Sequence, residues 1–275
     1  MKHVLIVGFL WLTSISHAEK KPVKVQLISE MDGIISGQTF NLGLHIQHEK
    51  GWHTYWKNPG DVGLAPTMKW ELPKGFEAMP FLWASPEIHK MGIIDVQAYH
   101  GEVTHILPIK APIGLENDSV VTLKGRLSWL MCSKQCIPAF QDVSINLPVL
   151  KQPTFIGEWK EVFFRTKTQQ PVVVEGWNIT ALDKGKIIEM QINPGEDLPK
   201  TPAKPWFFCD ENHITTQKHP EYKQLGRGLV IRMSKTEWAP AKITQLSGHL
   251  NSPQGWDRSG KIKNLRVSIP VDTLN

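Results

Sequence analysis

Most of the chain alternates between apolar and polar residues, which is the period-two pattern of β-strands with one buried face. In residues 51–61, bulky aromatic residues lead into an Asn-Pro-Gly-Asp turn, so we expect a strand that ends in a tight turn. Residues 80–99 contain several helix and strand breakers, and we expect a long loop there. The alternation predicts strands over residues 24–29, 39–47, 68–72, 103–109, 121–131 and 143–147.

The pattern changes near residue 150, which predicts a domain boundary. Ile156, Trp159 and Phe163 follow a helical spacing, and Thr154 is a candidate N-cap for that helix. Further along, short apolar runs separated by Gly, Pro, Asn and Asp return to the strand pattern. The sequence therefore predicts an all-β protein with one helix. The expected segments are a first β-sandwich domain at 19–150, a linker helix at 151–170 and a second β-sandwich domain at 171–275.

The first residues are typical of a secretory signal peptide. A short basic start, Met1-Lys2-His3, precedes an apolar run of about nine residues and the small-residue segment Ser16-His17-Ala18. A membrane-spanning helix needs about twenty apolar residues, so this run is too short to be one. We expect cleavage after Ala18, a signal peptide at 1–18, and export to the periplasm, where disulfides persist.

Charge and composition exclude some classes of function. The formal net charge is +5, and the basic residues are spread along the chain without interleaved aromatics. This distribution argues against dedicated nucleic-acid binding. Of the three cysteines, Cys132 and Cys136 have only three residues between them, and Cys209 is distant in sequence. We expect Cys209 to be buried and unreactive, as isolated cysteines usually are.

The spacing of Cys132 and Cys136 allows a disulfide between them. A ring of about five residues stabilises a fold by only about 2 kcal/mol in the chain-entropy model, so the pair is better suited to thiol exchange than to stapling a domain. Lys134 lies inside the ring and can favour a thiolate, and Pro138 restricts the backbone just after Cys136. Thiol exchange needs no organic cofactor.

Two other interpretations of the pair remain open. One is a purely structural disulfide. The other is a copper-handling site, because Met131 and the two cysteines are soft ligands suited to Cu(I), and His53 or His100 could add a nitrogen ligand. No second C-x-x-C motif or adjacent histidine completes a closed site, so we assign no metal ligands from the sequence.

Three motifs resemble one family of redox proteins. These motifs, residues 51–63, 98–103 and 129–138, are similar to the periplasmic amino-terminal region of the transmembrane disulfide reductase DsbD. They are more similar to the same region of its ScsB-type copper-sensitivity suppressor relatives, because DsbD has a longer spacing between its cysteines. The resemblance extends over nearly all of the chain after the signal peptide.

The resemblance implies immunoglobulin-like β-sandwiches and a cysteine pair that carries electrons. A membrane-embedded disulfide reductase domain would supply the electrons, and a periplasmic thioredoxin-fold protein would receive them. Because the chain ends at Asn275 without a membrane domain, we expect that donor to be a separate protein. By motif position, Cys136 would form mixed disulfides, Cys132 would resolve them, and Tyr99 would cover the pair as an aromatic cap. Cys209 stands where the family usually has proline.

Overall fold

The computed structural model describes residues 21–273, and the predicted signal peptide at 1–18 lies outside them. One helix accompanies the strands in this part of the chain, and it is not long and apolar enough to cross a membrane. The elements are β1 (Val23–Ser29), β2 (Thr39–His48), β3 (Thr54–Gly60), β4 (Thr67–Glu71), β5 (Glu77–Ala78), β6 (Glu87–Met91), β7 (Ile94–Tyr99), β8 (Glu102–Lys110), β9 (Val120–Cys132), β10 (Cys136–Pro148), α1 (Gly157–Thr168), β11 (Trp177–Asp183), β12 (Ile187–Pro194), β13 (Trp206–Cys209), β14 (Glu221–Leu225), β15 (Gly228–Ser234), β16 (Gln245–Asn251) and β17 (Asn264–Thr273).

The first domain is a sandwich of two antiparallel sheets. One sheet has the strand order β1-β2-β8-β5 and the other has the order β10-β9-β4. Their inner faces share one core, to which β2 contributes Leu42 and Leu44 and β9 contributes Leu123 and Leu127, all fully buried. Burying each such side chain contributes about 1.5–3 kcal/mol, so the alternation that predicts these strands also stabilises the sandwich.

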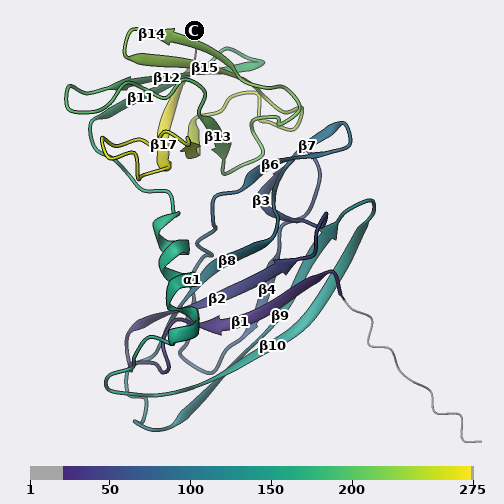
Figure 1. The fold of residues 1–275 in the computed structure, drawn as a ribbon, viewed down its shortest axis with the longest axis vertical. Coiled ribbons are helices and arrows are strands. Elements are labelled where there is room, and N and C mark those ends of the chain that lie inside the picture. Colours follow the sequence, from purple (N-terminus) through teal and green to yellow (C-terminus); the bar gives the residue numbers. More distant parts are fainter. Residues whose placement is uncertain (1–20, 274–275) are drawn as a thin grey trace, which may run out of the picture.

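A third, smaller sheet lies at the end of this sandwich that faces the second domain (Figure 1). Its strand order is β3-β7-β6, and β6 and β7 form a hairpin whose last paired residues are Met91 and Ile94. The predicted long loop at 80–99 is therefore wrong in its second half. Gly92 adopts a φ of 65° in the tight turn, a conformation that glycine tolerates without strain. The two strands are too short for their alternation to stand out in the sequence.

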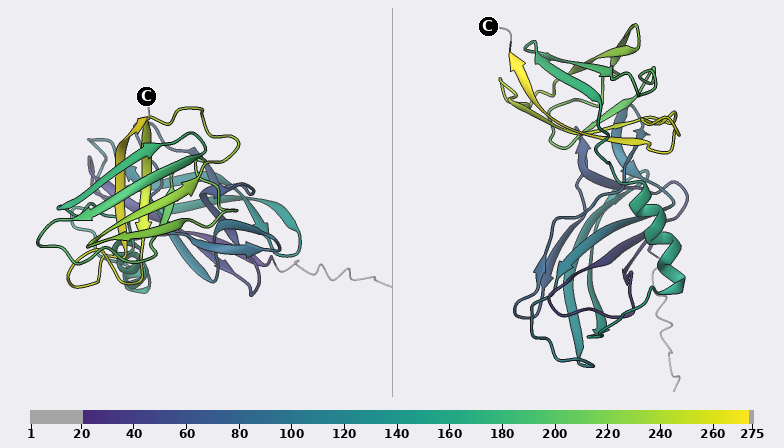
Figure 2. Two further views of the ribbon diagram at one scale, coloured as in Figure 1. Left: turned by 90° about the horizontal axis from the view of Figure 1, so that it is seen from above. Right: turned by 90° about the vertical axis from the view of Figure 1, so that its left-hand side faces the viewer.

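Helix α1 packs along the outer face of the first sandwich (Figure 2). Phe163 is buried against Ile28 of β1 and Ile106 of β8, so the helix is part of the first domain's packing and does more than connect the domains. Thr154 is not the N-cap: its hydroxyl donates a hydrogen bond to Asp32, and the cap residue is Ile156.

The second domain is built from β11–β17, hydrogen-bonded in the order β13-β16-β17-β11-β12-β15-β14. Strand β17 pairs with β16 over most of its length and with β11 at its last residues, so it passes from one layer to the other. The two layers enclose a second core that includes Met190, Ile231, Leu246 and Trp256. The prediction of two immunoglobulin-like β-sandwiches with a short helix between them is confirmed.

Strand β3 also joins the first domain to the second. The amide of Asn58 donates hydrogen bonds to the carbonyl oxygens of Cys209 and Glu211, at 2.8 and 2.9 Å. Lys57 forms an ion pair of 2.6 Å with Asp210. These three contacts define what we call the seam between the domains. The motif at 51–63 therefore holds the two domains together as well as contributing to the region around the cysteine pair.

Candidate functional site

The cysteine pair lies at the tip of a long hairpin. Strand β9 ends at Cys132 and β10 begins at Cys136, and the two residues face each other across the ladder with a Cα–Cα distance of 4.1 Å and a disulfide between them. The connection is the three-residue turn 133–135, and β10 begins seven residues before the strand expected at 143–147. Pro138 lies within β10, opposite Leu130, and the ladder accepts it because β10 is an edge strand.

The two cysteines differ sharply in exposure. Cys132 is fully buried, and its backbone N–H and carbonyl both bond to His53, at 3.0 and 2.9 Å. Cys136 is exposed, as are Lys134 in the turn and Pro138 beyond it. A protein approaching this end of the molecule can therefore reach Cys136, whereas Cys132 is fixed from behind by the chain that enters β3.

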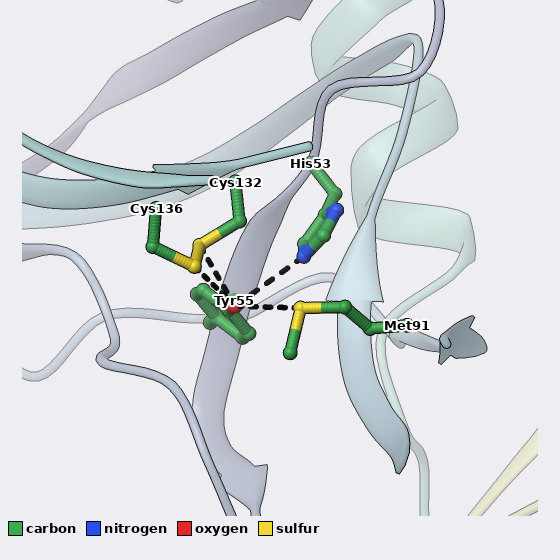
Figure 3. The surroundings of a disulfide bond; sticks show 5 residues. All are labelled: His53, Tyr55, Met91, Cys132 and Cys136. Carbon is green, nitrogen blue, oxygen red and sulfur yellow. Dashed lines mark hydrogen bonds between the residues drawn. A yellow bond between two sulfur atoms is a disulfide. The ribbon is translucent and has the colours of Figure 1, made fainter. Parts of the chain in front are cut away.

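Tyr55 lies against the buried side of the disulfide (Figure 3). Its hydroxyl donates to Cys132 Sγ at 3.0 Å and lies 3.8 Å from Cys136 Sγ. The same oxygen is 3.3 Å from His53 Nε2 and 3.8 Å from Met91 Sδ. Burial raises the pKa of Tyr55, so the phenol stays protonated and remains a hydrogen-bond donor.

A glycine makes room for that ring. At Gly63, where φ is +114°, an added Cβ would lie 2.4 Å from Cε1 of Tyr55. Any other residue would have to displace the ring that contacts the sulfurs, and it would also strain the backbone. The final glycine of the motif at 51–63 is therefore tied to the position of Tyr55.

Tyr99 does not lie on the disulfide. Its hydroxyl donates to the carbonyl oxygen of Ala84 at 2.6 Å, and its ring packs with Trp56 and Phe208. The neighbouring residue, Ala98, is the one that shares a cluster with Cys132. Successive residues of a strand point to opposite faces, which separates Tyr99 from the cysteines. Tyr55, not Tyr99, is the aromatic residue in contact with the pair.

The side chain of Met131 does not pack with the cysteine pair. It packs in the main core of the first sandwich, whereas Cys132 belongs to the separate cluster beneath the small sheet. The copper site considered from the sequence, with Met131 and both cysteines as ligands, is not assembled. Of the two histidines considered for it, His53 and His100 do come together, and they meet a third that the sequence interpretation missed, His89.

These three histidines share one face of the small sheet with Tyr55. Cross-strand pairs lie on the same face, and the registers Tyr55↔Ala98 and His89↔Val96 place these residues on the side that faces Cys132. Burial and repulsion from the other two histidines lower the pKa of His53 to about 4, and burial lowers the pKa values of His89 and His100. All three are therefore neutral at pH 7.

Tyr55, His89 and Met91 are the functional-site residues that sequence reasoning missed. Tyr55 could have been found, because it lies two positions after His53 in a predicted strand and so shares its face. His89 and Met91 gave no such signal, since the segment 80–99 was interpreted as a loop.

Cys209 lies in the seam between the domains. It is a free, buried cysteine at the end of β13, and burial raises the pKa of its thiol to about 12. Its carbonyl oxygen accepts the hydrogen bond from Asn58. A thiol with so high a pKa is almost never a thiolate near neutral pH, so the environment of Cys209 does not support exchange chemistry.

Comparison with known proteins agrees with this geometry. Residues 21–148 match the family described as "Thiol:disulfide interchange protein DsbD, N-terminal". The match spans nearly the whole first domain, which therefore resembles a DsbD N-terminal domain. The matched region holds both the disulfide and the small sheet behind it, so it supports a thiol:disulfide interchange domain built around Cys132 and Cys136.

The similarity in fold extends over both domains. The N-terminal periplasmic domain of ScsB from Proteus mirabilis is 22% identical, with a TM-score of 0.64, and the match covers 91% of this chain and 92% of that one. A protein of unknown function from Porphyromonas gingivalis W83 is 9% identical over 92% of this chain and 100% of that chain, with a TM-score of 0.27. No protein with a curated description matches the sequence.

Proposed function

We propose that this protein is a periplasmic electron relay. Its Cys132–Cys136 pair would take electrons from a membrane-embedded disulfide reductase, a separate protein, and pass them to a thioredoxin-fold partner. The observation that supports this most directly is the unequal exposure of the two cysteines. Exchange through a mixed disulfide needs one sulfur that a partner can reach and a second that stays close behind it.

The proposed reaction transfers two electrons in two displacements. In the reduced protein, the Cys136 thiolate attacks one sulfur of the partner's disulfide and forms a mixed disulfide, and the partner's other sulfur leaves as a thiolate. The Cys132 thiolate then attacks Cys136 Sγ, which closes the Cys132–Cys136 disulfide and releases the partner as a dithiol. The membrane reductase restores the reduced pair by the same displacements in the reverse direction.

Tyr55 supports these steps from the buried side. Its hydroxyl donates to Cys132 Sγ, and a hydrogen bond to a sulfur that becomes a thiolate favours the charged form. The exposed face of the pair carries the turn at 133–135 with Lys134, which can favour the Cys136 thiolate by charge. The thiolate of Cys132 would thus be stabilised by the Tyr55 hydroxyl, and the thiolate of Cys136 by the charge of Lys134.

A trapping experiment tests the assignment of roles. The probe is a thioredoxin that keeps only its attacking cysteine, activated as a mixed disulfide with 5-thio-2-nitrobenzoate. Reduced Cys132→Ala protein should displace the nitrobenzoate and form a stable covalent complex. Wild-type protein should form the complex only transiently, because Cys132 resolves it, and Cys136→Ala protein should form little, because Cys132 is buried.

The outcomes separate this proposal from the structural alternative. Strong trapping by Cys136→Ala and none by Cys132→Ala would reverse the roles of the cysteines. Trapping by neither variant would indicate a structural disulfide. The reduction potential gives an independent check: an exchange couple should lie above about −300 mV, whereas structural disulfides typically lie below that value.

A further inference from the structure

Three histidine side chains converge directly behind the redox pair. His53 precedes β3, His89 lies in β6 and His100 follows β7. The ring centroids are 4.6 Å apart for His53 and His89, 4.3 Å for His89 and His100, and 5.7 Å for His53 and His100. One nitrogen from each ring lies within 4.8 Å of the others. Ligand nitrogens of a tetrahedral ion are about 3.4 Å apart, so small side-chain rotations would complete a site.

Two of these rings have a nitrogen with no hydrogen-bond partner among the described residues. These atoms are Nδ1 of His53 and Nε2 of His100, and both are buried. The Nε2 atom of His53 contacts Tyr55, and the other nitrogen points away from the disulfide (Figure 3). Buried polar atoms are nearly always satisfied, so two unpartnered nitrogens within one cluster of three histidines call for a ligand.

The opposite nitrogens of the same two rings each lie near an oxygen atom of another side chain. The Nδ1 atom of His100 lies 3.9 Å from a carboxylate oxygen of Glu87. The Nε2 atom of His53 lies 3.3 Å from the hydroxyl of Tyr55. A hydrogen bond from Nε2 of His53 to the Tyr55 oxygen leaves Nδ1 of that ring free for a metal, and a small side-chain rotation would let the Glu87 carboxylate do the same for His100.

One histidine of this cluster borders a surface cavity. Glu87 and His100 are among the residues that line a surface cavity of about 240 Å³. His89 and His100 are partly exposed, whereas His53 is buried at the back. The cluster is thus open on one side, and an ion bound there would keep a coordination position for water or another ligand.

We propose that His53, His89 and His100 form a binding site for Zn²⁺ or a copper ion. Imidazole nitrogen suits these late first-row metals, whereas Mg²⁺ and Ca²⁺ require oxygen ligands. The site differs from a cysteine-based copper site because none of its ligands is a redox-active sulfur. It can therefore hold an ion while the Cys132–Cys136 disulfide is closed, and it does not depend on the proposed electron relay.

The site is connected to the cysteines through Tyr55. With the ion on Nδ1 of His53, the proton of that ring lies on Nε2 and can be donated to the Tyr55 oxygen. The Tyr55 hydroxyl is then left to donate to Cys132 Sγ, 3.0 Å away. Metal binding thus selects one direction for the hydrogen bonds that end on the buried sulfur.

The test measures metal binding by the full-length protein in its disulfide form, with any affinity tag removed. Zn²⁺ is titrated by calorimetry, and Cu⁺ is titrated anaerobically against a chromophoric chelator. We expect one ion per chain. His89→Gln and His100→Gln should each weaken binding at least 100-fold, and Glu87→Gln should weaken it about tenfold. His213→Gln, in the second domain, is the matched control and should bind as the wild type does.

Both substituted histidines are partly exposed, so their variants should fold, which circular dichroism can verify. Binding of Zn²⁺ alone, copper alone or both would support the proposal and identify the ion. Binding of neither ion at micromolar concentration would overturn it. So would binding that persists in His89→Gln and His100→Gln, or binding that appears only after reduction and is lost in Cys132→Ala.

Discussion

The segment from His53 to Asn58 contacts a cysteine at each of its ends, and the environments of the two cysteines are opposite. At one end, His53 and Tyr55 support the Cys132–Cys136 disulfide at the exposed tip of a hairpin. At the other end, Asn58 holds the carbonyl of Cys209 in the seam between the domains, where the thiol is buried and its pKa is raised to about 12. The same element therefore contributes to a region that a partner can reach and to one that it cannot.

The difference shows that the reactivity of a cysteine is decided by its surroundings. Cys132 and Cys209 are both buried, yet Cys132 has a hydroxyl donor and an exposed cysteine bonded to it, and Cys209 has neither. Backbone contacts stabilise both positions. Only the hairpin tip adds an accessible sulfur, that of Cys136, and the contrast between this tip and the contacts between the domains can be tested in four ways.

Alkylation rates should show the largest difference. After reduction, iodoacetamide at pH 8 should label Cys136 about 10³-fold faster than Cys209, because a thiol with a pKa of about 12 is ionised to only about one part in 10⁴ at that pH. Mass spectrometry of timed samples measures the rates. In guanidinium, all three cysteines should react similarly. Equal labelling of Cys136 and Cys209 in the folded protein would contradict the comparison.

Loss of the seam should destabilise the protein. Asn58→Ala removes both hydrogen bonds to the carbonyls of Cys209 and Glu211 and leaves buried oxygens unpaired, so the free energy of unfolding should fall by about 2–4 kcal/mol. Urea titration measures it, and labelling of Cys209 should accelerate. Asn146→Ala, on the exposed face of β10, should change stability by less than about 0.5 kcal/mol. A similar loss in both variants would show that the seam has no special role.

Acid should weaken a second contact between the domains, in which His249 of β16 bonds to Ser85 and packs against Trp56. Burial lowers the pKa of His249 to about 3; the charge of Asp210 opposes this shift, and the charges of Arg266 and Lys57 add to it. The unfolded chain binds a proton below about pH 6.5 that the folded protein does not, so His249 stabilises the fold above that pH and loses up to about 1.4 kcal/mol per pH unit below it.

The variant His249→Gln isolates this effect. Its free energy of unfolding should fall less steeply than that of the wild type between pH 6.5 and pH 4. Glutamine keeps a polar group near Ser85, which bonds to His249 Nε2 at 2.8 Å. Urea titrations across this range measure the two slopes, and identical slopes would exclude a buried neutral His249.

The smallest effect should come from Tyr55→Phe. Loss of one hydroxyl removes the hydrogen bond to Cys132 Sγ, which favours the reduced sulfur, so the disulfide should become harder to reduce. One hydrogen bond contributes about 1 kcal/mol, which corresponds to a change of about fivefold in the equilibrium constant with dithiothreitol. Tyr222→Phe removes a hydroxyl that donates to Pro205 in the second domain and should leave that constant unchanged. A shift toward easier reduction would contradict the role of Tyr55.

The sequence by itself determined the longer strands of the first sandwich and the partnership of Cys132 with Cys136. Alternation is a local property, and the burial of core strand β9 follows it closely because one face of that strand lies on the core. Two cysteines with only three residues between them, at the end of a strand, are close enough to form a disulfide. The amphipathic strand predicted at 121–131 ends just before the cysteines, so the pair was expected at the margin of the sheet, where Cys136 is exposed.

Only the tertiary structure decided what surrounds the pair. Tyr55 replaces Tyr99 beside the sulfurs because the register of β3 with β7 puts Ala98, and not Tyr99, on the face shared with Tyr55. His89 joins His53 and His100 because the β6–β7 hairpin folds back onto β3. Pairing between strands is set by closure of the whole sheet, and no residue's immediate neighbours in sequence carry that information.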